Sequence, residues 1–179
     1  MPANACVVVA LALVIAVPAP AAFADPTADA RAAYDLANAQ ANELLYRRAD
    51  IEDVVNAHLL AIERAPALGF GRYIVSATTP FAPEDLALLH RDAPAVLRRL
   101  FPSFEALYGA RGWRMFPRID RVYVNASARH ELGWQPRHHF AQVLGCLAAE
   151  REFRSPLALA VGAKGYHATT FGELPYPVD

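Results

Sequence analysis

Lysine is almost absent from the sequence: Lys164 stands alone beside sixteen arginines in 179 residues. Chemistry that needs an amine, such as Schiff-base formation, therefore has a single candidate residue. Guanidinium groups are suited to paired contacts with phosphate or carboxylate groups. The basic side chains thus favour anion binding over amine chemistry.

Cysteine is also scarce, and neither sign of charge predominates. Cys6 and Cys146 allow at most one disulfide bridge, so the fold must rest on packing. A net charge of −1 provides no overall field that would attract nucleic acid. Because 55% of the residues are hydrophobic and 20% are charged, the chain can bury a core. We expect one folded unit that does not bind nucleic acid.

The sequence lacks the common motifs of nucleotide, metal and nucleophile sites. Neither G-x-G-x-x-G nor the P-loop pattern occurs, and the six histidines include no H-E-x-x-H pair. G-x-S-x-G is absent as well. Cys146 lies in an apolar stretch, which favours a small core residue over a reactive thiolate. The residues themselves therefore predict no catalytic site and no metal site.

An uncharged apolar run at residues 6–17 is shorter than the ~20 residues that a membrane-spanning helix requires. Its length fits the hydrophobic region of a signal peptide that ends near Ala24, but no basic residue precedes Arg31. The alternatives are a buried strand or translation from an unsuitable start. We expect no membrane span and favour the cytoplasm, with export as the alternative.

Apolar periodicity predicts several helices. Ile51, Val54, Val55, Leu59 and Ile62 recur at helical spacing and define one apolar face of a helix that Asp50 can cap. Pro66 and Gly69 are expected to end this helix. Other helices are expected over residues 26–48, 83–90, 95–100, 126–132 and 140–147, with those at 83–90 and 95–100 on the surface; short strands are expected over 72–77 and 120–124.

Six of the sixteen arginines form two groups of interest, and the second group surrounds two aromatic residues. Guanidinium forks beside aromatic rings would suit a nucleotide diphosphate, whereas the alternative is a solvated loop in an arginine-rich protein. The first group is Arg47 and Arg48; the second is Arg111, Arg114, Arg118 and Arg121, with Trp113 and Phe116.

Three stretches taken in order resemble a known family. They are residues 47–65, 71–81 and 121–136, and they contain Asp53-Val54-Val55, the run Tyr73 to Ala77, and Leu132-Gly133-Trp134-Gln135-Pro136. Their order and spacing are similar to the C-terminal half of the extended short-chain dehydrogenases, the NAD-dependent epimerase/dehydratase family. The resemblance covers about residues 40–150.

This resemblance implies a partial α/β fold: a substrate-binding lobe with two short strands, lacking the N-terminal Rossmann nucleotide-binding half. It divides the chain into an apolar segment at 1–25, the lobe at 26–154 and an irregular tail at 155–179. It also implies a nucleotide-sugar or related substrate, with Arg48 and Arg118 or Arg121 at the phosphates.

The sequence departs from the family where the redox chemistry resides. Family members bind NAD through a glycine-rich turn and use a Tyr-x-x-x-Lys pair, but Ala160 stands four residues before Lys164. We therefore expect a catalytically incomplete homologue that binds no NAD alone. The alternative is a non-enzymatic module that binds a ligand or a partner. Apolar surface left without its cover would promote self-association.

Overall fold

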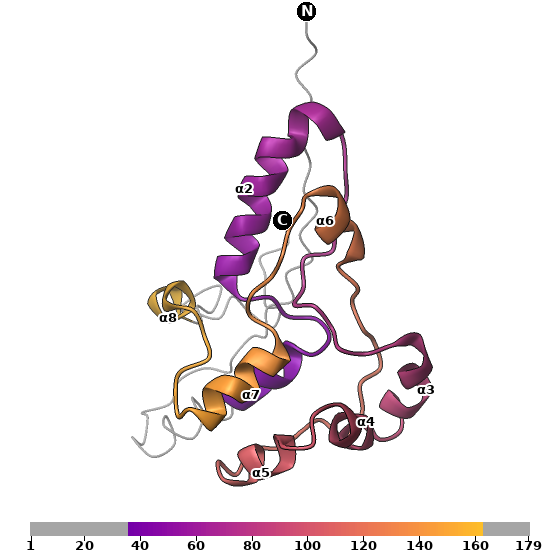
Figure 1. Cartoon of the computed structure of the whole chain (residues 1–179), viewed down its shortest axis with the longest axis vertical. Helices are drawn as coiled ribbons and strands as arrows, with labels where there is room; N and C mark the ends of the chain where they lie inside the picture. Colours follow the sequence, from indigo (N-terminus) through magenta and orange to yellow (C-terminus); the bar gives the residue numbers. More distant parts are fainter. Residues whose placement is uncertain (1–35, 163–179) are drawn as a thin grey trace, which may run out of the picture.

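The computed structural model describes residues 36–162, and all regular elements in this range are helices (Figure 1). The expected α/β class is therefore wrong for the described part of the chain. A helical stretch at 36–43 comes first. It is followed by α2 (Ile51–Leu68), the 3-10 turn η1 (Pro83–Asp85), α3 (Leu86–Leu89), α4 (Ala93–Leu100), α5 (Phe104–Gly109), α6 (Ala126–Glu131), α7 (Phe140–Ala148) and α8 (Pro156–Val161).

The two predicted strands are irregular segments. Ala77 N donates to Arg48 O at 2.7 Å, and Tyr123 N donates to Tyr46 O at 2.7 Å. Each is a single bond, whereas a sheet requires a repeated ladder. The β-branched side chains of these segments also lack the neighbours that favour a strand, because Ile74 and Val124 are 48% and 59% exposed.

Helix α2 begins and ends where the sequence predicts. Asp50 Oδ1 accepts a hydrogen bond from Glu52 N at 2.9 Å, which caps the start. Gly69 ends the helix with φ 71° and donates its N–H to Ala65 O. Pro66 lies inside the last turns rather than stopping the helix. The local signals are therefore sufficient to fix this element.

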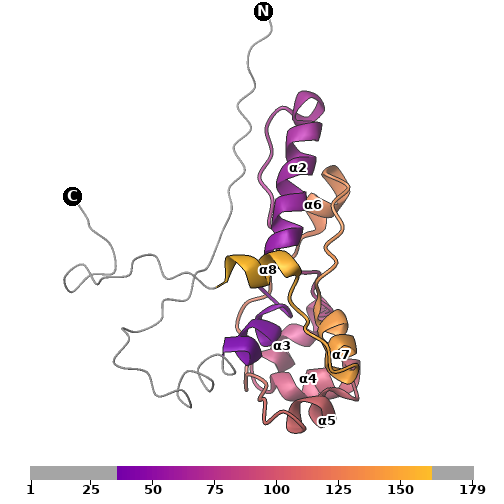
Figure 2. The ribbon, with the colours of Figure 1, turned by 90° about the vertical axis from the view of Figure 1, so that its left-hand side faces the viewer.

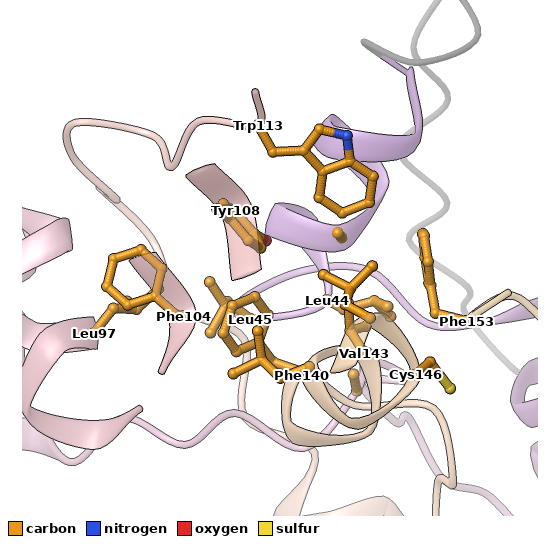
Figure 3. Close-up of a cluster of buried hydrophobic side chains, with 14 residues drawn as sticks. Leu44, Leu45, Leu97, Phe104, Tyr108, Trp113, Phe140, Val143, Cys146 and Phe153 are labelled. Carbon is orange, nitrogen blue, oxygen red and sulfur yellow. The ribbon is translucent and has the colours of Figure 1, made fainter. Parts of the chain in front are cut away.

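The largest core cluster lies where α4, α5 and α7 meet the residues that follow the first helical stretch (Figure 3). Aromatic rings meet edge to face in it, with Phe101 and Phe140 centroids 5.2 Å apart and Tyr108 and Trp113 centroids 5.5 Å apart. The expected apolar face of α7 is confirmed, and Cys146 is buried as predicted. The labelled members are Leu44, Leu45, Leu97, Phe104, Tyr108, Trp113, Phe140, Val143, Cys146 and Phe153.

Two smaller clusters complete the packing. One joins α2 to α6 and contains Ala57, Ala61, Tyr73, Ala128, Leu132 and Trp134. The other contains Leu89, Ala93, Val96 and Ile119. The helices expected near 83–90 and 95–100 therefore form but do not merely cover the surface.

Two helices are additions to the sequence prediction. Helix α5 was not expected, and α8 occupies the start of the region expected to be irregular. The apolar segment at 1–25, the proposed cleavage near Ala24, and Lys164 lie outside the described residues. No helix within residues 36–162 combines the length and apolarity that crossing a bilayer would require.

Candidate functional site

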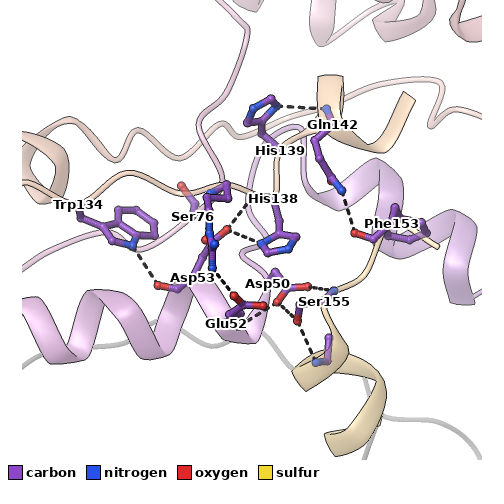
Figure 4. A network of polar contacts seen from close by, with 12 residues as sticks. Asp50, Glu52, Asp53, Ser76, Trp134, His138, His139, Gln142, Phe153 and Ser155 are labelled. Carbon is purple, nitrogen blue, oxygen red and sulfur yellow. Dashed lines mark hydrogen bonds and ion pairs between the residues drawn. The ribbon is translucent and has the colours of Figure 1, made fainter. Parts of the chain in front are cut away.

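Asp53, a buried residue of the Asp-Val-Val motif, is bonded to Trp134 of the Leu-Gly-Trp-x-Pro motif and to the two residues that follow that motif (Figure 4). Asp53 Oδ1 accepts from Arg137 N at 2.9 Å, while Oδ2 accepts from His138 N at 2.9 Å and contacts His138 Nδ1 at 3.1 Å. Trp134 Nε1 donates to the backbone oxygen of Asp53 at 3.0 Å. The start of α2 is thus fixed to the segment that follows α6.

A second carboxylate fixes α8 to the start of α2. Asp50 Oδ2 accepts from Ser155 N at 3.0 Å, and Asp50 Oδ1 accepts from Ser155 Oγ at 2.5 Å (Figure 4). Ser155 Oγ in turn accepts from Ala158 N at 3.0 Å and caps α8. Because Asp50 and Asp53 already accept bonds from the protein, both carboxylates hold the fold together rather than present a free base.

Sequence reasoning missed this second junction. Ser155 before a proline is a recognisable helix N-cap and could have indicated the start of α8. Its pairing with Asp50 spans 105 positions in the sequence, and no local signal predicts such a contact.

Arg48 and its neighbour Arg47 share one acidic partner. Arg48 Nη1 lies 3.0 Å from Glu43 Oε2, and Arg47 pairs with the other oxygen of Glu43. The Arg47 guanidinium also lies over the Tyr46 ring, 5.3 Å from its centroid. Two guanidinium groups against one carboxylate leave one positive charge without a compensating partner.

Arg118 and Arg121 lie on the neighbouring segment. Arg118 is exposed, with Nε 4.0 Å from Asp120 Oδ2, and Arg121 is exposed as well. The bond from Tyr123 N to Tyr46 O places this segment beside Tyr46–Arg48. We call Arg47, Arg48, Arg118 and Arg121, with the Tyr46 and Phe116 rings, the arginine face.

Electrostatics agree with this proximity. Burial is the main cause that raises the pKa of Tyr46, and Glu43 and Asp120 add to the increase while Arg47 opposes it. Glu43 raises the pKa of Arg47 against the effect of burial. Tyr46 thus lies within the influence of charges from both segments, and the Tyr46 and Phe116 rings meet edge to face with centroids 6.3 Å apart.

Arg111 and Arg114 are held by other parts of the chain. Arg114 N donates to Asn38 Oδ1 at 3.1 Å. Arg111 Nη2 donates to Leu147 O at 2.8 Å, so this guanidinium is held at the end of α7. Arg111 and Trp113 line an open pocket of about 480 Å³ together with Phe153 and the charged Glu150, Arg151 and Glu152. The structure therefore separates the predicted cluster, leaving Arg118 and Arg121 at the arginine face.

Within residues 36–162, no group of three or more His, Cys, Asp or Glu side chains could hold a metal ion. His58 Nδ1 contacts Val54 O at 2.8 Å, in agreement with a satisfied packing role. Comparisons with known protein families, with curated proteins and with solved structures give no match.

Proposed function

We propose that this chain is a substrate-binding lobe of the epimerase/dehydratase type and binds a nucleotide-sugar or related phosphate-bearing ligand at the arginine face. The observation that carries the proposal is the Tyr123–Tyr46 backbone bond, because it brings the segments of Arg48 and Arg121 together. The sequence separates these segments by more than seventy residues. A ligand site that uses both Arg48 and Arg121 requires a fold that brings these two segments together.

The chemistry of the arginine face suits a diphosphate. Arg47 and Arg48 pair with Glu43, and Arg118 lies 4.0 Å from Asp120, so the four arginines of the face outnumber these two carboxylates. Guanidinium forks bind phosphate oxygens through paired hydrogen bonds. The Tyr46 and Phe116 rings offer apolar surface beside these charges.

The junction at Asp53 supports the family part of the proposal. Asp53 belongs to the Asp-Val-Val motif, and its partners are Trp134 and the two residues that follow the Leu-Gly-Trp-x-Pro motif. Two stretches that resemble the family in sequence are therefore also bonded to one another. A chance likeness of either stretch gives no reason for this contact.

The proposal is confined to binding. The 179 residues contain no glycine-rich turn and no Tyr-x-x-x-Lys pair, so we assign them neither NAD binding nor hydride transfer. NAD would belong to intact relatives, as the resemblance implies.

Titration of the full chain with UDP-glucose at low salt tests the proposal by calorimetry. We expect saturable binding that Arg48→Ala and Arg121→Ala each weaken about tenfold, as loss of a charged hydrogen bond predicts. Arg129→Ala is the matched control, because Arg129 is an exposed arginine on α6 outside the arginine face. It should leave the affinity unchanged.

Absence of binding at millimolar ligand would contradict the proposal, as would equal weakening by all three substitutions. A parallel titration with NAD should give no heat of binding. If NAD bound while UDP-glucose did not, the assignment to a substrate lobe would be wrong.

The second candidate is a module that binds a partner protein without any small ligand. The exposed outer side of α2, which carries Val55, Leu59 and Ile62, favours it.

A further inference from the structure

The most apolar stripe of α2 faces away from the core. Val55, Leu59 and Ile62 are 43%, 54% and 69% exposed. Ile51 and Pro66 fall on the same side by helical spacing, at four residues from Val55 and from Ile62. We call these five residues the outer stripe. It runs along almost the whole helix and contains no charged side chain.

The opposite side of α2 makes the contacts with the core. Ala57 and Ala61 pack in the cluster with Ala128 of α6, while Asp53 bonds to the segment after α6. Figures 1 and 2 place α6 and α8 on opposite sides of α2, and the bonds between Asp50 and Ser155 hold α8 at the helix start. Helix α8 itself exposes three apolar residues: Leu157, Leu159 and Val161.

Exposed apolar stripes of this length are typical of interaction surfaces. We propose that the outer stripe binds the outer stripe of a second copy of this chain, with the two α2 helices antiparallel about a two-fold axis near Leu59. A two-fold contact requires a surface that is complementary to itself.

The spacing along the outer stripe meets this requirement. With the helices antiparallel, Ile51 lies opposite Pro66 of the second copy, and Val55 lies opposite Ile62 of the second copy. The two Leu59 side chains meet at the centre. Each large apolar residue thus faces another, and no apolar residue of the stripe faces a charge.

Antiparallel packing must also accommodate the charge on one flank of the stripe. Glu52 and Glu63 lie on one flank of α2, and antiparallel packing brings Glu63 of one copy close to Glu52 of the other. Glu52 pairs with Arg137, whose side chain is 71% exposed. Arg137 can therefore contact both carboxylates and offset their repulsion.

The inference goes beyond ligand binding and does not depend on it. No residue of the outer stripe belongs to the arginine face, so dimerisation and UDP-glucose binding can succeed or fail separately.

Sedimentation of the full chain between about 1 and 100 μM is the first test. Leu59→Glu places two carboxylates at the centre of the contact, so we expect it to raise the dissociation constant at least about 100-fold. Leu86→Glu is the control, since Leu86 of α3 is 49% exposed and lies outside the stripe. A monomeric wild type, or equal effects of both substitutions, would overturn the proposal and leave the stripe to a different partner.

Cross-linking is the second test, and it decides the arrangement even if Leu59→Glu fails to fold. In a Cys6→Ser background, oxidised Leu59→Cys should form a covalent dimer. Val55→Cys alone should not, whereas Val55→Cys with Ile62→Cys should. Cross-linking by Val55→Cys alone would indicate parallel helices, and absence of cross-linking by Leu59→Cys would remove Leu59 from the centre; either result contradicts the proposal.

Discussion

Single residues fix contacts between parts of the chain that are far apart in sequence. Asp53 bonds to residues 84 and 85 positions away, and Asn125 Nδ2 donates to Ser76 O at 2.8 Å and to Thr78 Oγ1 at 3.1 Å. These polar groups are buried, so loss of one partner leaves another group unsatisfied. Such residues should dominate the stability of the chain.

Asp53→Asn tests this expectation. The amide can no longer accept from Arg137 N and His138 N with both of its terminal atoms, so we expect the free energy of unfolding to fall by about 3 kcal/mol. Urea unfolding monitored by circular dichroism measures the change. Glu105→Gln is the control, because the Arg98–Glu105 pair is exposed and should contribute about 1 kcal/mol or less. Equal losses would show that Asp53 is not a structural junction.

Tyr108 predicts the response to alkaline pH. Burial raises the pKa of Tyr108 above its ordinary value of 10.0. The folded state therefore keeps the neutral phenol while the unfolded chain ionises, so the stabilisation is complete below pH 10 and is lost as the pH rises further. Tyr108→Phe should reduce the slope of unfolding free energy above pH 10 by about 1.4 kcal/mol per pH unit.

The same substitution has a second effect near neutral pH. Tyr108 OH donates to Asn42 Oδ1 at 2.9 Å, and loss of this bond should lower the free energy of unfolding by about 1 kcal/mol. Denaturant unfolding at several pH values separates the two effects. Parallel curves for wild type and variant above pH 10 would contradict the role of the buried phenol.

At the scale of elements, local signals predict where helices form but not which side they bury. The Asp50 cap and Gly69 mark α2 correctly, but the apolar face that the spacing predicts is divided, with Val54 buried and Val55, Leu59 and Ile62 exposed. The structure nevertheless buries the side with Asp53, Val54, Ala57 and Ala61. Small residues allow α6 to approach closely, and no pattern within α2 reveals that choice.

The strand predictions were wrong for a related reason. Residues 72–77 have the composition of a strand, but a strand exists only when another segment supplies a ladder. The described residues supply one bond at Ala77. In the same way, Arg48 and Arg121 could be named as candidates from the resemblance, whereas the Tyr123–Tyr46 bond that joins their segments becomes evident only in three dimensions.

Two glycines provide a matched test at this scale. Gly69 ends α2 with φ 71°, so Gly69→Ala should destabilise the protein by about 1 kcal/mol. Gly145 lies inside α7 and nothing occupies the space around an added Cβ, so Gly145→Ala should stabilise by up to about 1 kcal/mol. Thermal unfolding measures both. A change of stability in the same direction for both substitutions would contradict the different roles of these two glycines.

At the scale of the whole molecule, the described part of the chain has two surfaces with different chemistry. The arginine face carries excess positive charge, and the outer stripe of α2 is uncharged and apolar. The core clusters are built from α4, α5 and α7 and from α2 with α6. The two proposed contacts, with a ligand and with a second copy, therefore use different residues.

Dimerisation through the outer stripe would couple stability to protein concentration. Because only folded chains present α2 as a continuous stripe, association stabilises the native state by mass action. The melting temperature of the wild type should therefore rise as the concentration increases from about 1 to 100 μM, by several degrees if the dimer forms in that range. Leu59→Glu should melt at a temperature independent of concentration, while Leu86→Glu should follow the wild type. Differential scanning fluorimetry across the series measures all three, and a wild-type melting temperature that does not change with concentration would mean that folding and association are not coupled through α2.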